Sequence, residues 1–421
     1  MIRIGRRSLL AGAATLAATG ARAATAARLR MFWWGSKERG DRTLKASAAF
    51  MQANPGVTIE GETLGWGDYW TKLATQVAGR NPPDIIQMDY RYIFEYARRG
   101  TLLALDKFVP GTLAIQDFGK AADGGRVDGK LYGVNLGQNS TATFFNATAF
   151  EAAGLQPPAW DTTWDGYASL GAQLTKKAAK PGFWGLSDGG IREPLFEVFV
   201  RQRGKALYDS SGKLAFGDTD AADWFQLWTD MRKAGACVPA DVAALDKASL
   251  DTTSLALGKS AVDFDHSNQL VGLQAIIKDK LGMTMDPAGG AGMKPGQYYK
   301  PSQLWSVAAS TRYPEEAVRV VNFTVENPEG AKILGAERGI PASPKIRAAI
   351  APELDPLDRM MLDYIAFIEE RIGDLPPAPP NGAGEIAFRL QEVNAAVGFG
   401  KMTPKDAGKK FVDDANDILA R

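Results

Sequence analysis

From about residue 28 to residue 99, short apolar runs alternate with longer amphipathic stretches. Short apolar runs predict buried strands, whereas apolar positions repeated every three or four residues predict helices. In chain order we expect a strand over 29–34, a helix over 43–53, a strand over 57–62, a helix that Asp68 caps, a strand over 84–88 and a helix over 92–99. Strands that alternate with helices predict a parallel sheet covered by helices on both faces.

A second region with the same kind of pattern begins near Gly133. We expect a strand over 141–146, a helix, a Gly-Lys turn and a strand within 244–267, a flexible glycine loop over 289–296, a strand over 304–310 and a helix over 313–325. The prolines of 375–382 predict a stiff connector. Thr403 and Pro404 have the cap and first-turn proline of a final helix.

The strand over 29–34 ends in two adjacent tryptophans. Successive side chains of a strand point to opposite faces, so Trp33 and Trp34 cannot enter the same layer. We expect Trp33 to pack beneath the sheet and Trp34 to face a cleft. Sugars have an apolar C–H face and a rim of hydroxyls, so a cleft that binds them combines aromatic rings with polar groups.

In open α/β sheets, ligands lie beyond the carboxyl ends of the strands. Applied to the three expected strands, this rule selects Trp34, Ser36, Lys37, Trp66, Asp68, Asp89, Tyr90 and Arg91 as candidate binding residues. Two of these residues also have a purely structural explanation. Asp68 could serve only as a helix cap. Arg91 could pair with Asp89 inside the protein, whereas its binding role would be to contact the carboxylate of an acidic sugar.

Composition narrows the class of protein. A chain of 421 residues suggests two domains, and its 45% hydrophobic and 23% charged residues are typical of a soluble globular protein. Lys plus Arg total 49 and Asp plus Glu total 48. Since binding to nucleic acid requires a basic surface, we exclude nucleic acid as a partner.

The N-terminus has the features of an export signal over 1–23. Arg3, Arg6 and Arg7 precede a weakly apolar stretch, and Ala21-Arg22-Ala23 resembles the site that signal peptidase cleaves. The adjacent arginines favour the twin-arginine route, with an ordinary secretory signal as the alternative. Beyond this signal, no apolar run approaches the roughly 20 residues needed to span a bilayer.

The single cysteine and the single histidine exclude several kinds of site. Cys237 stands alone and far from the signal, which excludes an intramolecular disulfide, a cysteine metal cluster and a lipid-anchored N-terminal cysteine. His266 is the only histidine, so no two-histidine metal site can form. No phosphate-binding loop occurs, and we expect neither a cofactor nor a metal. The mature protein is expected to be soluble in the periplasm.

One catalytic motif has to be considered. Residues 185–189 match GxSxG, the nucleophile elbow of α/β-hydrolases, with Ser187 as the nucleophile. Asp251 or Asp263, followed by His266, would complete a triad in the right chain order. The elbow requires a helix directly after the serine, and here two glycines and Pro194 delay one. We therefore favour a glycine-rich turn and keep a secreted hydrolase as an alternative.

Six segments together resemble the extracellular solute-binding proteins of ABC transporters, in the carbohydrate-binding group that includes maltose-binding protein. They are FWWGSK, FMQANPGVTIE, NPPDIIQMDYRYIFEYARRGTLLALD, GRVDGKLYGVNLGQNSTATFFN, LALGKSAVDFD and PEEAVRVVNFTVENPEGAKILGAERGIPAS. The resemblance implies an α/β, two-lobed periplasmic binding protein fold (type II-like), with hinged lobes that each contain a central sheet flanked by helices. By analogy, lobe one comprises 28–137 plus 309–352, and lobe two comprises 138–308 plus 353–421.

The resemblance also implies further ligand contacts. Asn139, beside Gln138 at the expected crossover between lobes, matches a family position that contacts ligand. Asp265 and His266 end a strand whose following turn carries a stacking aromatic in many relatives, where this chain has Asn268. Arg91 stands at the position where maltose-binding protein has an acidic residue that contacts the sugar. Trp305, which begins a strand near the expected hinge, is a good candidate for a second aromatic platform. Two weaker analogies add Trp184 and Arg338 as contacts.

Together these features predict a binding protein, not an enzyme. We expect it to bind a sugar or oligosaccharide between two lobes and to deliver it, as a monomer, to the membrane permease of an ABC importer. The same fold could instead bind an acidic sugar or another anionic solute. A polysaccharide hydrolase or lyase would need a paired acid and base, for which only Asp89, Asp265 and His266 qualify.

Overall fold

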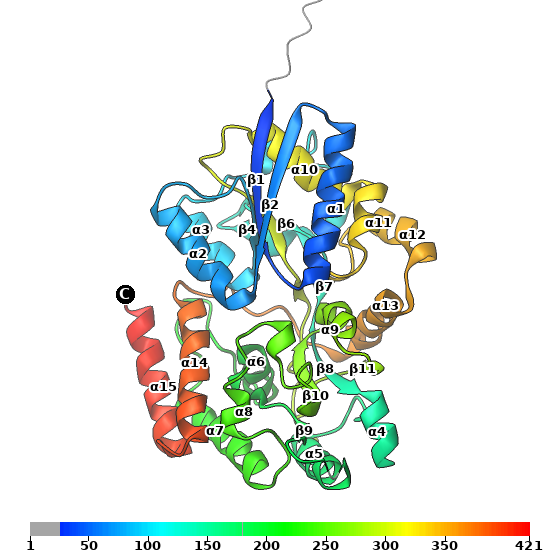
Figure 1. The fold of residues 1–421 in the computed structure, drawn as a ribbon. Helices are drawn as coiled ribbons and strands as arrows, with labels where there is room; N and C mark the ends of the chain where they lie inside the picture. The colour runs from blue at the N-terminus through cyan, green and yellow to red at the C-terminus, as the bar shows by residue number, and fades with distance from the viewer. Residues whose placement is uncertain (1–25, 179) are drawn as a thin grey trace, which may run out of the picture.

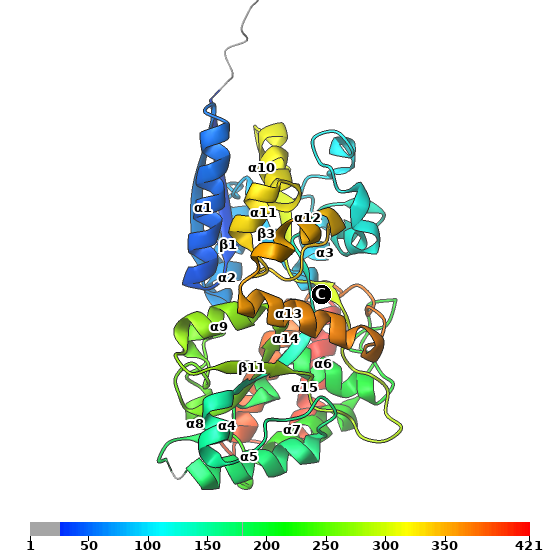
Figure 2. The same cartoon turned by 90° about the vertical axis from the view of Figure 1, so that its right-hand side faces the viewer.

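The computed structural model describes residues 26–178 and 180–421. The export signal expected over 1–23 lies outside these residues and stays a prediction. The described chain forms two α/β lobes, one above the other in Figure 1 and seen from the side in Figure 2. None of the helices in the described part of the chain has the length and apolar character that crossing a bilayer requires.

The first lobe contains a five-stranded sheet in the order β2-β1-β3-β13-β6. Its strands are β1 (Ala27–Trp34), β2 (Val57–Leu64), β3 (Ile85–Met88), β6 (Val134–Asn135) and β13 (Leu304–Val307). β1 pairs in parallel with β2 and β3, as the alternation of strands and helices predicts. β13 pairs antiparallel with β3 and β6. The helices of this lobe are α1 (Lys37–Ala53), α2 (Trp66–Ala78), α3 (Tyr90–Arg98), α10 (Pro314–Glu326), α11 (Pro328–Leu334) and α12 (Pro344–Ile350).

The second lobe contains a four-stranded sheet in the order β11-β8-β10-β9. Its strands are β8 (Thr141–Asn146), β9 (Trp184–Leu186), β10 (Ser260–His266) and β11 (Leu281–Thr284). Its helices are α4 (Ala147–Ala153), α5 (Trp164–Ala178), α6 (Glu193–Gln202), α7 (Asp218–Lys233), α8 (Ala240–Ala243), α9 (Leu270–Ile276), α13 (Pro356–Ile368), α14 (Ala383–Gly398) and α15 (Pro404–Leu419). The largest apolar cluster of the described residues lies here, where α5, α6, α7, α14 and α15 bury apolar side chains against the sheet.

The lobes are connected where short strands lie side by side. β7 (Gln138–Asn139) pairs antiparallel with β12 (Lys300–Pro301), and Gln138 also forms a bridge with Ile340. One further hairpin, β4 (Arg126–Val127) with β5 (Lys130–Leu131), lies in the first lobe. The chain therefore passes between the lobes at Gln138 and Asn139, as expected, and the segments at β12 and at Ile340 lie beside it.

The adjacent tryptophans of β1 lie on opposite faces of the sheet, as expected. Trp33 is fully buried in the cluster that contains Phe50 and Val320. Trp34 packs on the other face with Tyr69 and Trp70. The alternation of a strand thus gives each ring a different environment.

Several expected boundaries were wrong. α1 begins at Lys37, six residues before the expected start, because Ser36 caps it by accepting a hydrogen bond from Arg39 N. Gly65, not Asp68, precedes α2, and Asp68 lies in its first turn with no capping bond to this helix. The helix expected after residue 244 is mostly turns with a short 3-10 helix at Leu250–Thr252.

The expected lobe boundary at residue 308 also needs correction. β13 forms its ladder with β3 in the first lobe, with Leu304 opposite Met88. The chain therefore returns to the first lobe between β12 and β13, before residue 304. The other lobe boundaries stay a proposal.

Candidate binding cavity

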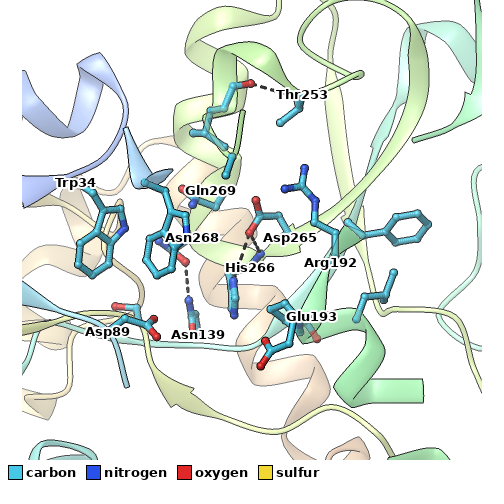
Figure 3. Close-up of a pocket in the computed structure, with 18 of the residues that line it drawn as sticks. Trp34, Asp89, Asn139, Arg192, Glu193, Thr253, Asp265, His266, Asn268 and Gln269 are labelled. Atoms are coloured by element: carbon cyan, nitrogen blue, oxygen red, sulfur yellow. Dashed lines mark hydrogen bonds and ion pairs between the residues drawn. The ribbon is translucent and has the colours of Figure 1, made fainter. Parts of the chain in front are cut away.

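A cavity lies between the two lobes and receives side chains from both. On the first lobe its lining includes Trp34, Trp66 and Asp89, which follow or end β1, β2 and β3. On the second lobe it includes Asp265 and His266 at the end of β10. The cavity thus lies at the carboxyl ends of strands in both sheets, where open α/β folds place ligands. Figure 3 shows Trp34 on one side and Arg192 and Glu193 on the other.

Aromatic rings form one wall of this cavity. Trp34 lines it while only 5% exposed, and its ring meets that of Trp66 nearly at right angles, with centroids 5.0 Å apart. Behind Trp34 lies Trp70, with ring centroids 5.4 Å apart. Arg39 Nη1 and Gln87 Nε2 both donate to the Trp34 carbonyl oxygen, at 3.2 and 3.1 Å. The wall is therefore held rigidly from behind.

Gly35 allows the turn after β1 to approach α1 closely. A Cβ atom at this position would lie 2.3 Å from Arg39 Cδ, so any side chain would displace the arginine. Arg39 in turn forms a buried ion pair with Glu337, with Nε 2.8 Å from Oε1. The glycine therefore brings the Trp34 turn and this ion pair together.

Ion pairs connect the opposite wall to the first lobe. Arg91 on α3 pairs with Glu193 at the start of α6, which joins the two lobes across the cavity. Lys300 pairs with Asp89, with Nζ 3.4 Å from Oδ2. Burial raises the pKa of Asp89, but the charges of Lys300 and Arg91 outweigh it and hold this pKa below its ordinary value.

The second lobe adds a buried network around Arg192. Its Nη2 lies 2.6 Å from Asp246 Oδ2 and 3.9 Å from Asp263 Oδ1. Burial raises the pKa of Asp263 to about 6, although Arg192 and Ser187 oppose this shift. Asp265 lies 3.3 Å from His266 Nδ1. Burial and the nearby Lys300 lower the pKa of His266, so the imidazole is neutral near pH 7.

Asn139 lies deep in the cavity at the crossover between lobes. Its Nδ2 donates to Asn268 Oδ1 at 2.6 Å, and Asn268 Nδ2 donates to the Glu337 carbonyl oxygen at 3.2 Å (Figure 3 shows the first of these bonds). Asn268 therefore orients Asn139. The same bonds connect the cavity to the Arg39–Glu337 ion pair.

Eight of the fourteen residues selected from the sequence line this cavity. They are Trp34, Ser36, Trp66, Asp89, Arg91, Asn139, Asp265 and His266. Tyr90 lies in a smaller adjoining cavity that shares Asp89 and Arg91 with the first. Arg91 does not pair with Asp89 through its side chain. Instead, Asp89 Oδ1 caps α3 by accepting from Arg91 N at 2.9 Å.

The other five selected residues lie away from both cavities. Lys37 is exposed on α1 and pairs with Asp41, and Asp68 is exposed on α2. Trp184 stands opposite Ser260, at the amino end of β10 and so at the edge of the sheet far from His266. Arg338 is buried and bonds Gln87 and Thr43.

Trp305 is 0% exposed and packs in the same cluster as Trp33, on the face of the sheet that Trp34 does not share. The Arg338 guanidinium lies over its ring, 5.4 Å from the centroid. These contacts enclose the indole completely. We therefore remove Trp305 from the set of candidate aromatic platforms.

The sequence analysis missed Arg192, Glu193, Asp286 and Lys300, all of which line the cavity. Asp286 follows β11, a strand that was not expected, so the carboxyl-end rule could have found it if that strand had been recognised. Arg192 and Glu193 lie at the start of α6 and Lys300 lies in the short strand β12, and none of the three belongs to a local motif.

The GxSxG segment does not form a catalytic triad. Ser187 is buried and donates directly to Asp263 Oδ1 at 2.7 Å, while His266 pairs with Asp265. The serine is followed by a 3-10 helix at Gly189–Ile191, not by the α-helix that an elbow requires. Ser187 instead orients Asp263 beside Arg192.

Comparisons with other proteins extend these observations. The family model described as "Bacterial extracellular solute-binding protein" matches residues 45–357. A solved extracellular solute-binding protein family 1 from Alicyclobacillus acidocaldarius is 32% identical, with a TM-score of 0.65, and the match covers 94% of this chain and 98% of that one. A periplasmic oligogalacturonide binding protein from Yersinia enterocolitica, solved with saturated digalacturonic acid, is 23% identical with a TM-score of 0.84, covering 94% and 99%.

Among curated proteins, a probable amino-acid ABC transporter periplasmic-binding protein from Sinorhizobium fredii is 24% identical over 378 residues. The match covers 87% of this chain and 84% of that protein. All of these similarities extend over most of the chain.

Proposed function

Since the chain belongs to the bacterial extracellular solute-binding protein family, we propose that it binds a saccharide between its lobes and delivers it to the membrane permease of an ABC importer. The cavity carries this proposal, because it combines an indole wall with buried polar side chains. A sugar ring would place its apolar C–H face on Trp34 and its hydroxyls against Asp89, Asn139 and Asp265. Members of this family bind solutes without converting them, and the geometry around Ser187 agrees with such a role.

The shape of the cavity suits a small saccharide, since side chains of both lobes line it and can contact a sugar ring from two sides. A longer ligand would extend into the adjoining cavity beside Tyr90.

Closure of the lobes belongs to the same proposal. The passages at β7 and β12 act as a hinge, and the Arg91–Glu193 pair stabilises the closed form. A ligand that contacts both lobes shifts the population towards this form, in which both lobes present one joint surface to the permease. The sequence suggested that Arg91 would matter only for an anionic ligand. Its contact with Glu193 predicts an effect on every ligand.

Replacement of Arg91 with alanine is expected to weaken binding of neutral saccharides by about tenfold. The variant leaves Glu193 without its partner in the closed form, at a cost of at least about 1.4 kcal/mol. Arg98→Ala is the matched control, because Arg98 lies on the same helix and pairs with Asp128 on the surface of the first lobe. Calorimetric titration of both variants measures the effect, and equal affinity of the two variants would contradict a role for Arg91 in closure.

The proposed function is tested by thermal unfolding of the mature protein with neutral, acidic and amino saccharides. A ligand present at 100 times its dissociation constant is expected to add about 2.7 kcal/mol to the free energy of unfolding. Amino acids and inorganic phosphate serve as other classes of solute. If none of the saccharides raises the unfolding temperature while another class does, the saccharide assignment is wrong.

A further inference from the structure

Two acceptor atoms buried in the cavity have no hydrogen-bond partner among the described residues. The first is Asn139 Oδ1, on a side chain that is 1% exposed. The orientation of this amide is fixed, because Asn268 must present its Nδ2 to the Glu337 carbonyl and therefore its Oδ1 to Asn139. Asn139 Oδ1 is thus an acceptor that needs a donor from a ligand.

The second atom is Asp286 Oδ2, on a side chain that lines the cavity and is 3% exposed. Its other oxygen accepts from Thr143 Oγ1 at 3.2 Å. The Thr141 hydroxyl approaches the same carboxyl, but neither Thr141 Oγ1 nor Asp286 Oδ2 completes a hydrogen bond. An unsatisfied buried carboxylate oxygen is costly, so this position also calls for a donor.

The charges around the cavity favour a cation. Three cationic side chains line it, Arg91, Arg192 and Lys300, and each has a carboxylate partner. Arg192 also lies near a second carboxylate, that of Asp263. Because His266 is neutral, Asp265 and Asp286 have no cationic partner of their own among these residues. Arg39 and Arg338, farther back, share Glu337. Each cation that lines the cavity thus has its own carboxylate partner, and none of the three is left to neutralise an anionic ligand.

We infer that the ligand is a saccharide carrying a protonated amino group that donates to Asp286, while a second donor of the same ligand meets Asn139. The inference rests on the proposed function and names the class of saccharide. An ammonium group offers three donors and a positive charge, and so suits the buried carboxylate of Asp286. A hydroxyl offers one donor and no charge. A uronate carboxylate only accepts, and would lie against like charge.

Burial raises the pKa of Asp286 to about 7, against the opposing effect of the Thr141 and Thr143 hydroxyls. Asp265 raises it further. Ionised Asp286 is therefore destabilised in the empty cavity. An ammonium group beside ionised Asp286 removes this destabilisation, whereas a neutral sugar removes only part of it.

The test compares matched sets of hexose, 2-amino-2-deoxyhexose and hexuronate in the gluco, galacto and manno configurations, with the corresponding disaccharides. Calorimetric titration at pH 7 is expected to show at least tenfold tighter binding of the amino form than of the neutral form, and weakest binding of the uronate. N-acetylation of the amino sugar, which removes its charge, should abolish the preference. A neutral sugar or uronate that binds as tightly as the amino form would overturn the inference.

Asp286→Asn keeps the shape of the side chain and removes its charge. It is expected to reduce the preference for the amino form to about threefold or less, with a smaller effect on the neutral form. Asp417→Asn, an exposed change on α15, is the matched control and should retain the full preference. If neutral sugars bind and the amino form has no advantage, only the inference fails. If no saccharide binds, the proposed function fails and the inference with it.

Discussion

Exchange of Trp34 for leucine is expected to weaken saccharide binding by about tenfold, or about 1.4 kcal/mol. Trp34 is 5% exposed, so a ligand touches only the part of the indole that lines the cavity, and the main loss comes from the gap that the smaller side chain leaves in this wall. Leucine retains part of the packing against Tyr69 and Trp70, so the protein should stay folded. Calorimetric titration gives the change in affinity, and urea unfolding shows whether stability is retained.

The matched comparison is Trp66→Leu, because Trp66 lines the same wall but is less buried. It is expected to lose affinity with little loss of stability. If both variants retain wild-type affinity for the saccharide identified by the screen, the indole wall is not part of the binding site.

Replacement of Trp305 with alanine is expected to have the opposite effect. The ring is fully enclosed, so its removal should lower the free energy of unfolding by about 3–5 kcal/mol and leave the affinity of the folded protein unchanged. Arg338 would lose the ring over which it lies, which adds to the cost. Urea unfolding measures the first effect, and titration of the folded protein measures the second.

Trp305→Phe provides a milder version that remains folded if the alanine variant does not. The phenylalanine variant should bind ligand with wild-type affinity. A folded Trp305 variant with affinity reduced more than tenfold would show that this residue contacts the ligand, or supports the site directly.

The contrast between these tryptophans shows what the sequence can predict. Alternation along β1 distinguished Trp33 from Trp34, because neighbours in a strand must face opposite ways. The same local rule cannot relate Trp305 to Trp34, since their strands are distant in the chain. Only the pairing of β13 with β3 and β6 places Trp305 on the face of Trp33.

The candidate site also consists of a part that the sequence predicted and a part that it did not. The half contributed by the first lobe follows parallel strands, so the carboxyl-end rule found Trp34, Trp66, Asp89 and Arg91. In the second lobe, Arg192 and Glu193 enter the cavity from the loop before α6 and from its first turn. Their position depends on how the lobes face each other. No local pattern of hydrophobic and polar residues encodes that arrangement.

The first three strands were predicted from the alternation of short apolar runs with helical stretches, and the structure contains them as β1, β2 and β3. The crossover at β7 was predicted from the family resemblance instead. The segment after residue 244 was misassigned as helix. In the structure Leu250, in a short 3-10 helix, and Leu255, in a turn, instead contribute to the cluster around α9 and α13.

A crystal structure of the mature protein with the best saccharide from the screen tests the central claim most directly. We expect the ligand between the lobes, with a ring face on Trp34 and donor groups on Asn139 Oδ1 and Asp286 Oδ2. Density for the saccharide outside this cavity, with the cavity itself filled by solvent, would contradict the account.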